Sequence, residues 1–386
     1  MPANLRSRTK SCFILLAASA GFALSACGDD AGGDGGSSTS GATDDTVGSV
    51  SADDAPTPTA PNTSGADGTT GSDDDTPTAA TGDTGGTDTG DTDTGGTGSS
   101  DDGDSSEDGD SDEGSTGEPA DCDNLVPLPI GYQTVSGPSS SEDFVLDADG
   151  YLVNLDNGNL VHATYGNAST LLFPGVGAGF ASGTAMLSNG DVVFNASSQV
   201  TRVFGDGGTQ VLASGLSYPN GLTVDMDDYV YVAENSGARV VRIDPQTLDV
   251  VVMADGLNSP NGLAFDYTYE NLYVGSFGGG TVHRINIASG EVDLFASDIG
   301  TGGLDGVIVD ACDNVYVTDF GPGIVYKVDG LDHELVVDLP TGWIPNMHFG
   351  SGAGGWDSQR LYVMDIGGDQ QYELDLGVGG IPLPHL

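Results

Sequence analysis

Basic residues are the scarcest charged residues of this chain. Among 386 residues there are 9 lysines and arginines against 58 aspartates and glutamates, which gives a formal net charge of -49 at pH 7. After Cys122 the basic residues are isolated: Arg202, Arg239, Arg242, Arg284, Lys327 and Arg360. Proteins that bind nucleic acids present clustered basic residues and interleaved aromatic ones. The sequence has neither pattern, so nucleic acid is not an expected partner.

Long apolar runs are also lacking. The N-terminal one follows a basic start and covers roughly 15 residues, which is too short for a membrane-spanning helix and typical of a secretory signal. It predicts a signal peptide over residues 1–26. The run ends in Leu24-Ser25-Ala26-Cys27, which resembles the lipobox of bacterial lipoproteins. The resemblance implies a lipid on Cys27 that anchors the protein to a membrane of the bacterial cell envelope, on its periplasmic or cell-surface side.

Residues 27–121 contain no lysine, arginine or aromatic residue and almost only Gly, Ser, Thr, Asp, Ala and Pro after Cys27. Such a composition cannot offset the entropy of ordering, so it predicts a disordered tether. A flexible chain of roughly 94 residues reaches about 55 Å. Calcium binding by its aspartates is the alternative, but the spaced ligands and glycine of an EF-hand loop are missing.

From Cys122 onward no long helical period appears, and the chain instead repeats itself six times. The segment SYPNGLTVDMDDYVYVAEN returns about forty residues later as SPNGLAFDYTYENLYVGS, a period typical of one propeller blade. The matching positions, called anchors below, are Glu142, Ser182, Asn220, Asn261, Asp305 and Asn346. Alternating strands separated by polar turns follow each anchor. Residues 122–386 are therefore predicted to form an all-β, six-bladed propeller with four-stranded antiparallel blades.

The final repeat offers no obvious fourth strand, whereas GYQTVS, Gly131–Ser136, precedes the first repeat. We predict that this segment supplies the outer strand of the last blade. Its beginning would lie on the face that carries the turns between first and second strands, where Cys312 is also expected. Cys122 precedes the segment, and an even number of cysteines in an exported domain suggests a disulfide. A Cys122–Cys312 bond is therefore geometrically possible.

The six anchors occupy equivalent points of the innermost strands and are expected to meet near one end of the central channel. They comprise two carboxylates, three amides and one hydroxyl. This oxygen set suits a hard cation, most naturally Ca²⁺. Taken singly, Asn220 and Asn261 in Pro-Asn-Gly are typical of turns. Glu142 and Asp305 favour a shared metal site, because two carboxylates in a narrow channel repel unless a cation lies between them.

From Gly131 to the C-terminus these features resemble the senescence marker protein/gluconolactonase family of six-bladed propellers, which includes regucalcin and bacterial sugar lactonases. In that family one divalent metal is held by a Glu of the first blade, Asn residues of the third and fourth, and an Asp of the fifth. The matching residues here are Glu142, Asn220, Asn261 and Asp305. The resemblance implies a metal-dependent hydrolase of a lactone, another ester or a phosphotriester, with Asp305 as base or nucleophile.

The chain also departs from the family pattern. Regucalcin-like lactonases carry an Arg where this chain has Tyr218, which puts sugar-acid binding in doubt. Ile308 stands where some members have an Asp that binds a second calcium, so no copy of that site is expected. Ser182, Tyr218 and Asn346 are expected to line the channel. His348, two residues after Asn346, is a candidate for proton transfer, with packing or hydrogen bonding as the alternative.

Other interpretations stay open. A non-catalytic propeller, like NHL repeat proteins, would bind a protein or glycan on its faces and keep the metal for structure. A strictosidine-synthase-like propeller has less support, because its catalytic Glu cannot be placed in this sequence. Trp343 and Trp356 are expected either to shape the channel mouth or to pack in the core or rim. His162 and His283, on predicted third strands, are interpreted as structural.

Overall fold

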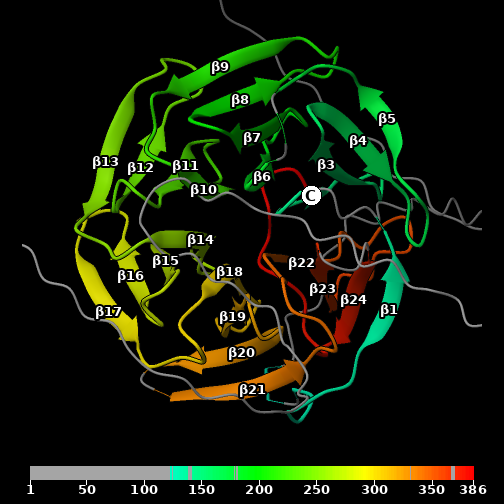
Figure 1. Ribbon diagram of the computed structural model, residues 1–386, viewed down its shortest axis with the longest axis vertical. Coiled ribbons are helices and arrows are strands. Elements are labelled where there is room, and N and C mark those ends of the chain that lie inside the picture. The colour runs from blue at the N-terminus through cyan, green and yellow to red at the C-terminus, as the bar shows by residue number, and fades with distance from the viewer. Residues whose placement is uncertain are drawn as a thin grey trace, which may run out of the picture. The chain divides into compact units, whose positions relative to one another are not determined.

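The computed structural model describes residues 122–123, 125–137, 141–177, 179, 181–330, 332–366 and 370–386. The predicted signal peptide, Cys27 and the tether lie outside the described residues. Six four-stranded antiparallel sheets surround a central axis as blades (Figure 1). The predicted all-β, six-bladed propeller is therefore confirmed. Within this part of the chain no helix is both long and apolar enough to cross a membrane.

The blades follow one another in chain order, and in each the first strand is the innermost. Blade 1 contains β2 (Val145–Leu146), β3 (Leu152–Asp156), β4 (Asn159–Ala163) and β5 (Thr170–Phe173). Blade 2 contains β6 (Gly183–Met186), β7 (Val192–Ala196), β8 (Gln199–Val203) and β9 (Thr209–Ser214). Blade 3 contains β10 (Pro219–Val224), β11 (Val230–Glu234), β12 (Arg239–Ile243) and β13 (Val250–Asp255). Blade 4 contains β14 (Pro260–Phe265), β15 (Asn271–Ser276), β16 (Val282–Asn286) and β17 (Val292–Ala296). Blade 5 contains β18 (Leu304–Val309), β19 (Val315–Asp319), β20 (Ile324–Asp329) and β21 (Asp332–Asp338). Blade 6 contains β22 (Met347–Phe349), β23 (Arg360–Asp365), β24 (Gln370–Asp375) and β1 (Gln133–Ser136).

Burial falls from the inner to the outer strands, as the sequence pattern suggests. In blade 3 the second strand β11, VYVAE, is buried along its whole length. The outer strand β13, VVVMAD, exposes its first three residues. Neighbouring blades cover both faces of the inner strands, whereas the outer strand forms the sheet edge. The β-branched and aromatic residues of the second strands therefore form the main core layer.

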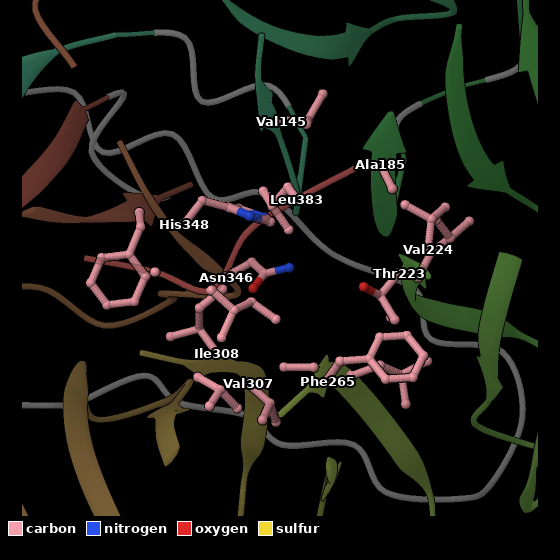
Figure 2. A pocket seen from close by; sticks show the side chains of 18 of the residues that line it. Val145, Ala185, Thr223, Val224, Phe265, Val307, Ile308, Asn346, His348 and Leu383 are labelled. Carbon is pink, nitrogen blue, oxygen red and sulfur yellow. The ribbon is translucent and has the colours of Figure 1, made fainter. Parts of the chain in front are cut away.

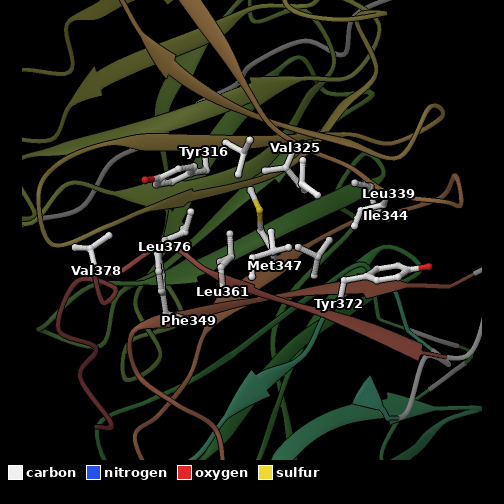
Figure 3. Packing of buried hydrophobic residues seen from close by; sticks show 14 residues of the cluster. Tyr316, Val325, Leu339, Ile344, Met347, Phe349, Leu361, Tyr372, Leu376 and Val378 are labelled. Carbon is white, nitrogen blue, oxygen red and sulfur yellow. The ribbon is translucent and has the colours of Figure 1, made fainter. Parts of the chain in front are cut away.

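The hydrophobic core lies between blades, with one cluster of buried side chains at each of the six interfaces. Figure 3 shows the interface of blades 5 and 6, where Tyr316 and Val325 from one sheet face Met347 and Leu361 from the other. Because every blade packs against two neighbours, the last interface forms only when the ring closes.

The N-terminal strand closes the ring. β1 pairs antiparallel with β24, from Gln133 opposite Glu373 to Ser136 opposite Gln370. The sequence prediction that this segment supplies the outer strand of the last blade is confirmed. A disulfide joins Cys122 to Cys312 in the β18–β19 turn, with 5.6 Å between the Cα atoms. The bond fixes the segment before β1 to the face that carries the turns between first and second strands.

The C-terminal segment crosses that same face and closes the channel, which the sequence did not indicate. Figure 1 shows this segment passing over the centre of the ring. The Ala311 amide donates to Gly379 O (2.9 Å), and the Tyr269 hydroxyl donates to Pro382 O (2.5 Å). His385 Nε2 lies 3.0 Å from Leu146 O at the end of β2. The channel is therefore blocked at the end where the first strands finish.

Removing the disulfide should destabilise the propeller. We expect the Cys122→Ser/Cys312→Ser variant to lose roughly 2–4 kcal/mol of unfolding free energy, because the bond shortens the unfolded chain across a long loop. Urea denaturation of the wild-type protein and the variant measures the difference. Peptide mass analysis before and after reduction tests the pairing itself, and free thiols at both positions in the oxidised protein would contradict it.

Candidate functional site

Three anchors sit in β-bulges at the start of the innermost strands. Pro219 of β10 pairs with Glu234 of β11, and Leu222 pairs with Val232. Two residues of β10 therefore lie between these pairs, whereas only one residue of β11 does. Equivalent register shifts occur in β14 and β18. The bulged pairs are Asn220-Gly221, Asn261-Gly262 and Asp305-Gly306. A bulge bends the strand and re-aims its side chains, and bulges are common beside active sites.

The glycine after an anchor is required by the close approach of the next blade. A Cβ atom on Gly221 would lie 2.2 Å from Asn261 O, and one on Gly262 would lie 2.2 Å from Asp305 O. No side chain fits at either position. The anchors of blades 3, 4 and 5 are thereby held next to one another around the axis.

Carboxylates from blades 1 and 5, which blade 6 separates, interact at this end of the channel. Burial raises the pKa of Asp305 well above its usual value, and the charges of Glu142 and Asp143 raise it further. A hydrogen bond with Asn261 lowers this pKa, but by less than the other causes raise it. Burial also raises the pKa of Glu142, which a hydrogen bond with Ser182 lowers and the charge of Asp143 raises. The tertiary structure thus brings negative charges from blades 1 and 5 together away from water.

The donor set of the anchors fits a cation. Asn261 is 2% exposed, and its Oδ1 is buried without a hydrogen-bond partner. A buried acceptor left unpaired costs about 1–3 kcal/mol, a cost that a bound cation would remove. Among the described residues no group of three or more His, Cys, Asp or Glu side chains is placed to hold a metal. A cation here would therefore need the asparagine oxygens in addition to Glu142 and Asp305.

Asp143 is a site residue that the sequence reasoning missed. It is fully buried, and its carboxylate accepts hydrogen bonds from the amides of Phe144 (2.8 Å) and Thr184 (2.7 Å). Its Oδ1 also lies 2.8 Å from His348 Nε2. The His348 ring contacts Phe144 edge to face, with 4.8 Å between centroids. Asp143 therefore fixes the orientation of His348, a residue of blade 6, from blade 1.

Buried polar residues at the ends of the second strands hold the loops that lead to the anchors. Glu234 accepts from the Ser217 amide (3.1 Å), and Asp319 accepts from the Thr301 amide (2.6 Å). Ser276 donates to Asn258 O. These three residues are at most 2% exposed. The sequence contained the signal: the second strands of blades 3 and 5, VYVAE and VYVTD, each end in an acidic residue after a mostly apolar run.

The remaining predicted channel residues lie beside the same end of the axis. Ser182 immediately precedes β6, and Asn346 immediately precedes β22, where its Oδ1 accepts from the Met347 amide (2.9 Å). Partial desolvation raises the pKa of Tyr218, as do the charges of Glu142 and Asp305, so its phenol lies near both carboxylates. The predicted lipidation site Cys27 lies outside the described residues.

Trp356 does not shape the channel mouth, which was one of its two expected roles. It is 1% exposed, its indole donates to Gly150 O (3.0 Å), and its ring packs against Tyr165 and Tyr362. This position belongs to the core between blades 1 and 6. Trp343, by contrast, is 53% exposed and precedes β22. His162 and His283 lie on the third strands β4 and β16.

A cavity of about 70 Å³ continues along the channel from the anchors to the C-terminal segment. Its wall is formed mainly by apolar residues of the innermost strands, and Leu383 and His385 close its far end. Figure 2 shows Asn346 and Thr223 pointing towards each other across this space, with His348 at its side. A cavity of this size admits water or a small chemical group. The polar anchors therefore open onto an apolar compartment.

The fold and the site define a six-bladed propeller with a buried, acidic, oxygen-rich centre at one end of its channel. Solved structures share this fold. A gluconolactonase from Xanthomonas campestris is 22% identical, with 67% of this chain and 96% of that chain covered and a TM-score of 0.52. A protein described as a putative gluconolactonase is 19% identical, with the same coverage and a TM-score of 0.53. Regucalcin from Agrobacterium tumefaciens, described as a calcium-binding protein, is 18% identical, with 67% and 98% covered and a TM-score of 0.51.

A comparison of the sequence with protein-family models and with curated proteins finds no match. The structural likeness, at these identities, shows a shared fold. The resemblance drawn from the repeated anchors is thereby supported at the level of the propeller fold, which this chain shares with a gluconolactonase and a regucalcin among other solved structures.

The acidic centre should make the cation-free protein less stable as the pH rises. A carboxyl group whose pKa is raised by folding stabilises the folded state only while it is protonated, and this contribution is lost above its unfolded value near pH 4. Asp305→Asn removes one of the interacting charges. We expect it to raise the melting temperature in chelator at pH 8 by roughly 2–4 °C or more, equivalent to about 1 kcal/mol, and to change it little at pH 4.

Thermal unfolding followed by circular dichroism at both pH values makes this measurement. Asp227→Asn, at an exposed carboxylate in the β10–β11 turn, is the matched control and should change neither value. An equal shift for Asp305→Asn at pH 4 and pH 8 would show that charge repulsion is not the cause.

Proposed function

We propose that this protein is a metal-dependent hydrolase of a lactone or another ester, tethered to the bacterial cell envelope through a lipid on Cys27. The observation that carries the proposal is the pairing of the buried carboxylate of Asp305 and the half-buried carboxylate of Glu142 with the partnerless oxygen of Asn261. A purely structural turn has no need to bury two mutually repelling charges. The fold shared with gluconolactonases and with a calcium-binding regucalcin supports the same conclusion.

Glu142, Asn220, Asn261 and Asp305 would hold the cation, for which Ca²⁺ is the natural choice because all four donors are oxygens. A bound Ca²⁺ would polarise the ester carbonyl and stabilise the negative charge that develops on its oxygen. It would also favour the ionised form of Asp305, whose pKa is otherwise raised.

Asp305 and His348 supply the groups for proton transfer or attack. The ionised Asp305 carboxylate would activate water as a general base or attack the carbonyl carbon directly. When His348 is neutral and its Nε2–H donates to Asp143, Nδ1 is left as an acceptor. Asp143 is then a positioning residue, because it fixes which nitrogen of His348 carries the proton.

Cys122, the first described residue, is bonded to the β18–β19 turn, whereas Asp305 lies at the other end of β18. A lipid on Cys27 would therefore hold the domain through a segment that joins it on the face opposite the site.

Turnover should require both the cation and Asp305. We expect the purified protein to bind Ca²⁺, measured by calorimetry, and to hydrolyse at least one member of a panel of lactones, aryl esters and phosphotriesters. Chelator should abolish turnover. Asp305→Asn should lower kcat by roughly 10²–10⁴-fold, the contribution of a positioned base, while Asp227→Asn leaves it unchanged.

Full turnover in chelator, or in Asp305→Asn, would refute the metal-dependent mechanism. Calcium binding without hydrolysis of any compound in the panel would favour the non-catalytic propeller, in which the metal serves structure.

His348 should contribute to kcat more than to substrate binding. His348→Gln keeps the size and a hydrogen bond to Asp143 but cannot shuttle a proton near neutral pH, so we expect kcat to fall by roughly 10²-fold with KM changed less than threefold. Steady-state kinetics over a range of pH tests this. His283→Gln, on the third strand β16, is the control. An unchanged pH profile in His348→Gln would leave His348 with a packing role.

A further inference from the structure

Three exposed aromatic side chains, Tyr218, Phe277 and Trp343, and the half-buried Phe320 lie on the face where the anchors open, and we call these four residues the aromatic rim. Tyr218 and Trp343 precede the first strands of blades 3 and 6, and they are 58% and 53% exposed. Phe277 follows β15, is 38% exposed and lies 6.0 Å from Phe320 between ring centroids. The Trp343 amide donates to Phe320 O (2.6 Å), and this hydrogen bond connects Trp343 to the Phe277–Phe320 pair.

Two residues of the rim are held in an unfavourable backbone conformation. Tyr218 has a φ of 52° and Trp343 a φ of 71°. Bulky residues rarely adopt this left-handed region, and such strain costs of order 1–3 kcal/mol. Hydrogen bonds hold the conformation, from the Asn235 amide to Tyr218 O (3.0 Å) and from the Ile366 amide to Trp343 O (3.2 Å). Ser259, which precedes Pro260 in blade 4 as Tyr218 precedes Pro219 in blade 3, has a similar φ of 46°. The conformation therefore belongs to the repeated loop, and what distinguishes Tyr218 and Trp343 is the exposed aromatic ring that each carries.

The compartment beneath the anchors favours an apolar group. Val145, Ala185, Ala264 and Ile308 are among the residues that line the cavity, and its few polar side chains include Asn346 and His348. A hydroxyl group placed there without a partner would cost about 1–3 kcal/mol. A small alkyl group would bury apolar surface favourably.

The charge distribution disfavours an anionic ligand. None of the basic residues in the described part of the chain lies on an innermost strand. Arg239, at the end of β12 nearest the anchors, is bound to the buried Glu234 (2.9 Å). The charges that face the site are those of Glu142, Asp143 and Asp305. A ligand carboxylate would therefore meet repulsion, whereas a neutral ester would not.

We propose that the site selects a neutral ester or lactone with an apolar or aromatic acyl or alkyl group, held by the aromatic rim, in preference to a sugar lactone. The proposed selectivity rests on the proposed hydrolase function and specifies the class of substrate that the hydrolase accepts. Tyr218 and Trp343 are the specificity-determining residues.

Binding and turnover can be tested separately with matched pairs of compounds. The lactones are dihydrocoumarin, which is aromatic, and glucono-δ-lactone, which is polyhydroxylated. Their lactam analogues, dihydroquinolinone and gluconolactam, resist hydrolysis and report binding alone by calorimetry of the calcium-loaded protein. We expect dihydroquinolinone to bind at least tenfold more tightly than gluconolactam. Tyr218→Ala and Trp343→Ala should each weaken its binding by roughly 3- to 12-fold, the effect of one lost aromatic contact.

Tyr267→Ala is the matched control, because Tyr267 is 49% exposed but lies in the β14–β15 turn on the opposite face. Its replacement should leave the affinity unchanged, and thermal unfolding checks that all variants are folded. Gluconolactam binding as tightly as dihydroquinolinone, or rim variants with wild-type affinity, would overturn the proposed substrate class. Tight dihydroquinolinone binding without hydrolysis of either lactone would instead refute the hydrolase and leave the ligand class standing.

Discussion

The innermost strands of neighbouring blades approach one another so closely around the axis that no side chain fits between them. Gly221 and Gly262 each face the backbone oxygen of the next anchor at a distance that excludes a Cβ atom. The bulge that precedes this contact turns Asn220, Asn261 and Asp305 towards the channel. One packing constraint thus both closes the ring and assembles the oxygen donors, so the site is a consequence of how the blades fit together.

Charge repulsion at the centre is opposed by the surrounding hydrogen bonds. Ser182 and Asn261 bond to the carboxyl groups whose pKa values burial raises, and Asp143 is satisfied by two backbone amides and His348. The protein therefore holds its acidic groups in place without neutralising them with arginine or lysine. This arrangement leaves a concentration of negative charge that a divalent cation complements, and it explains why the neutral amides are as important as the carboxylates.

The two faces of the propeller have different roles. The face with the turns between first and second strands carries the disulfide and the C-terminal segment, which together fix both ends of the domain and block the channel. The other face carries the anchors and the aromatic rim. Strand direction causes this division, because all first strands run the same way along the axis and therefore begin on one face and end on the other.

The repeat period and the anchor positions could be predicted from the sequence, because each is a local pattern that recurs along the chain. The strand of the N-terminal segment could be predicted because the last repeat lacks a fourth strand of its own. Asp143 could not be recognised, since it follows Glu142 in an acidic stretch and acquires its role only when His348 of blade 6 is brought beside it. The C-terminal segment has no repeat, so nothing indicated that it closes the channel. The sequence around Trp356 did not indicate whether this residue lies at the channel mouth or in the core. The sequence by itself determined the propeller and the chemical types of its central residues. Contacts between blades that are distant in sequence decided which residues are buried, which charges interact and which groups share the site, because only the closed ring creates these contacts.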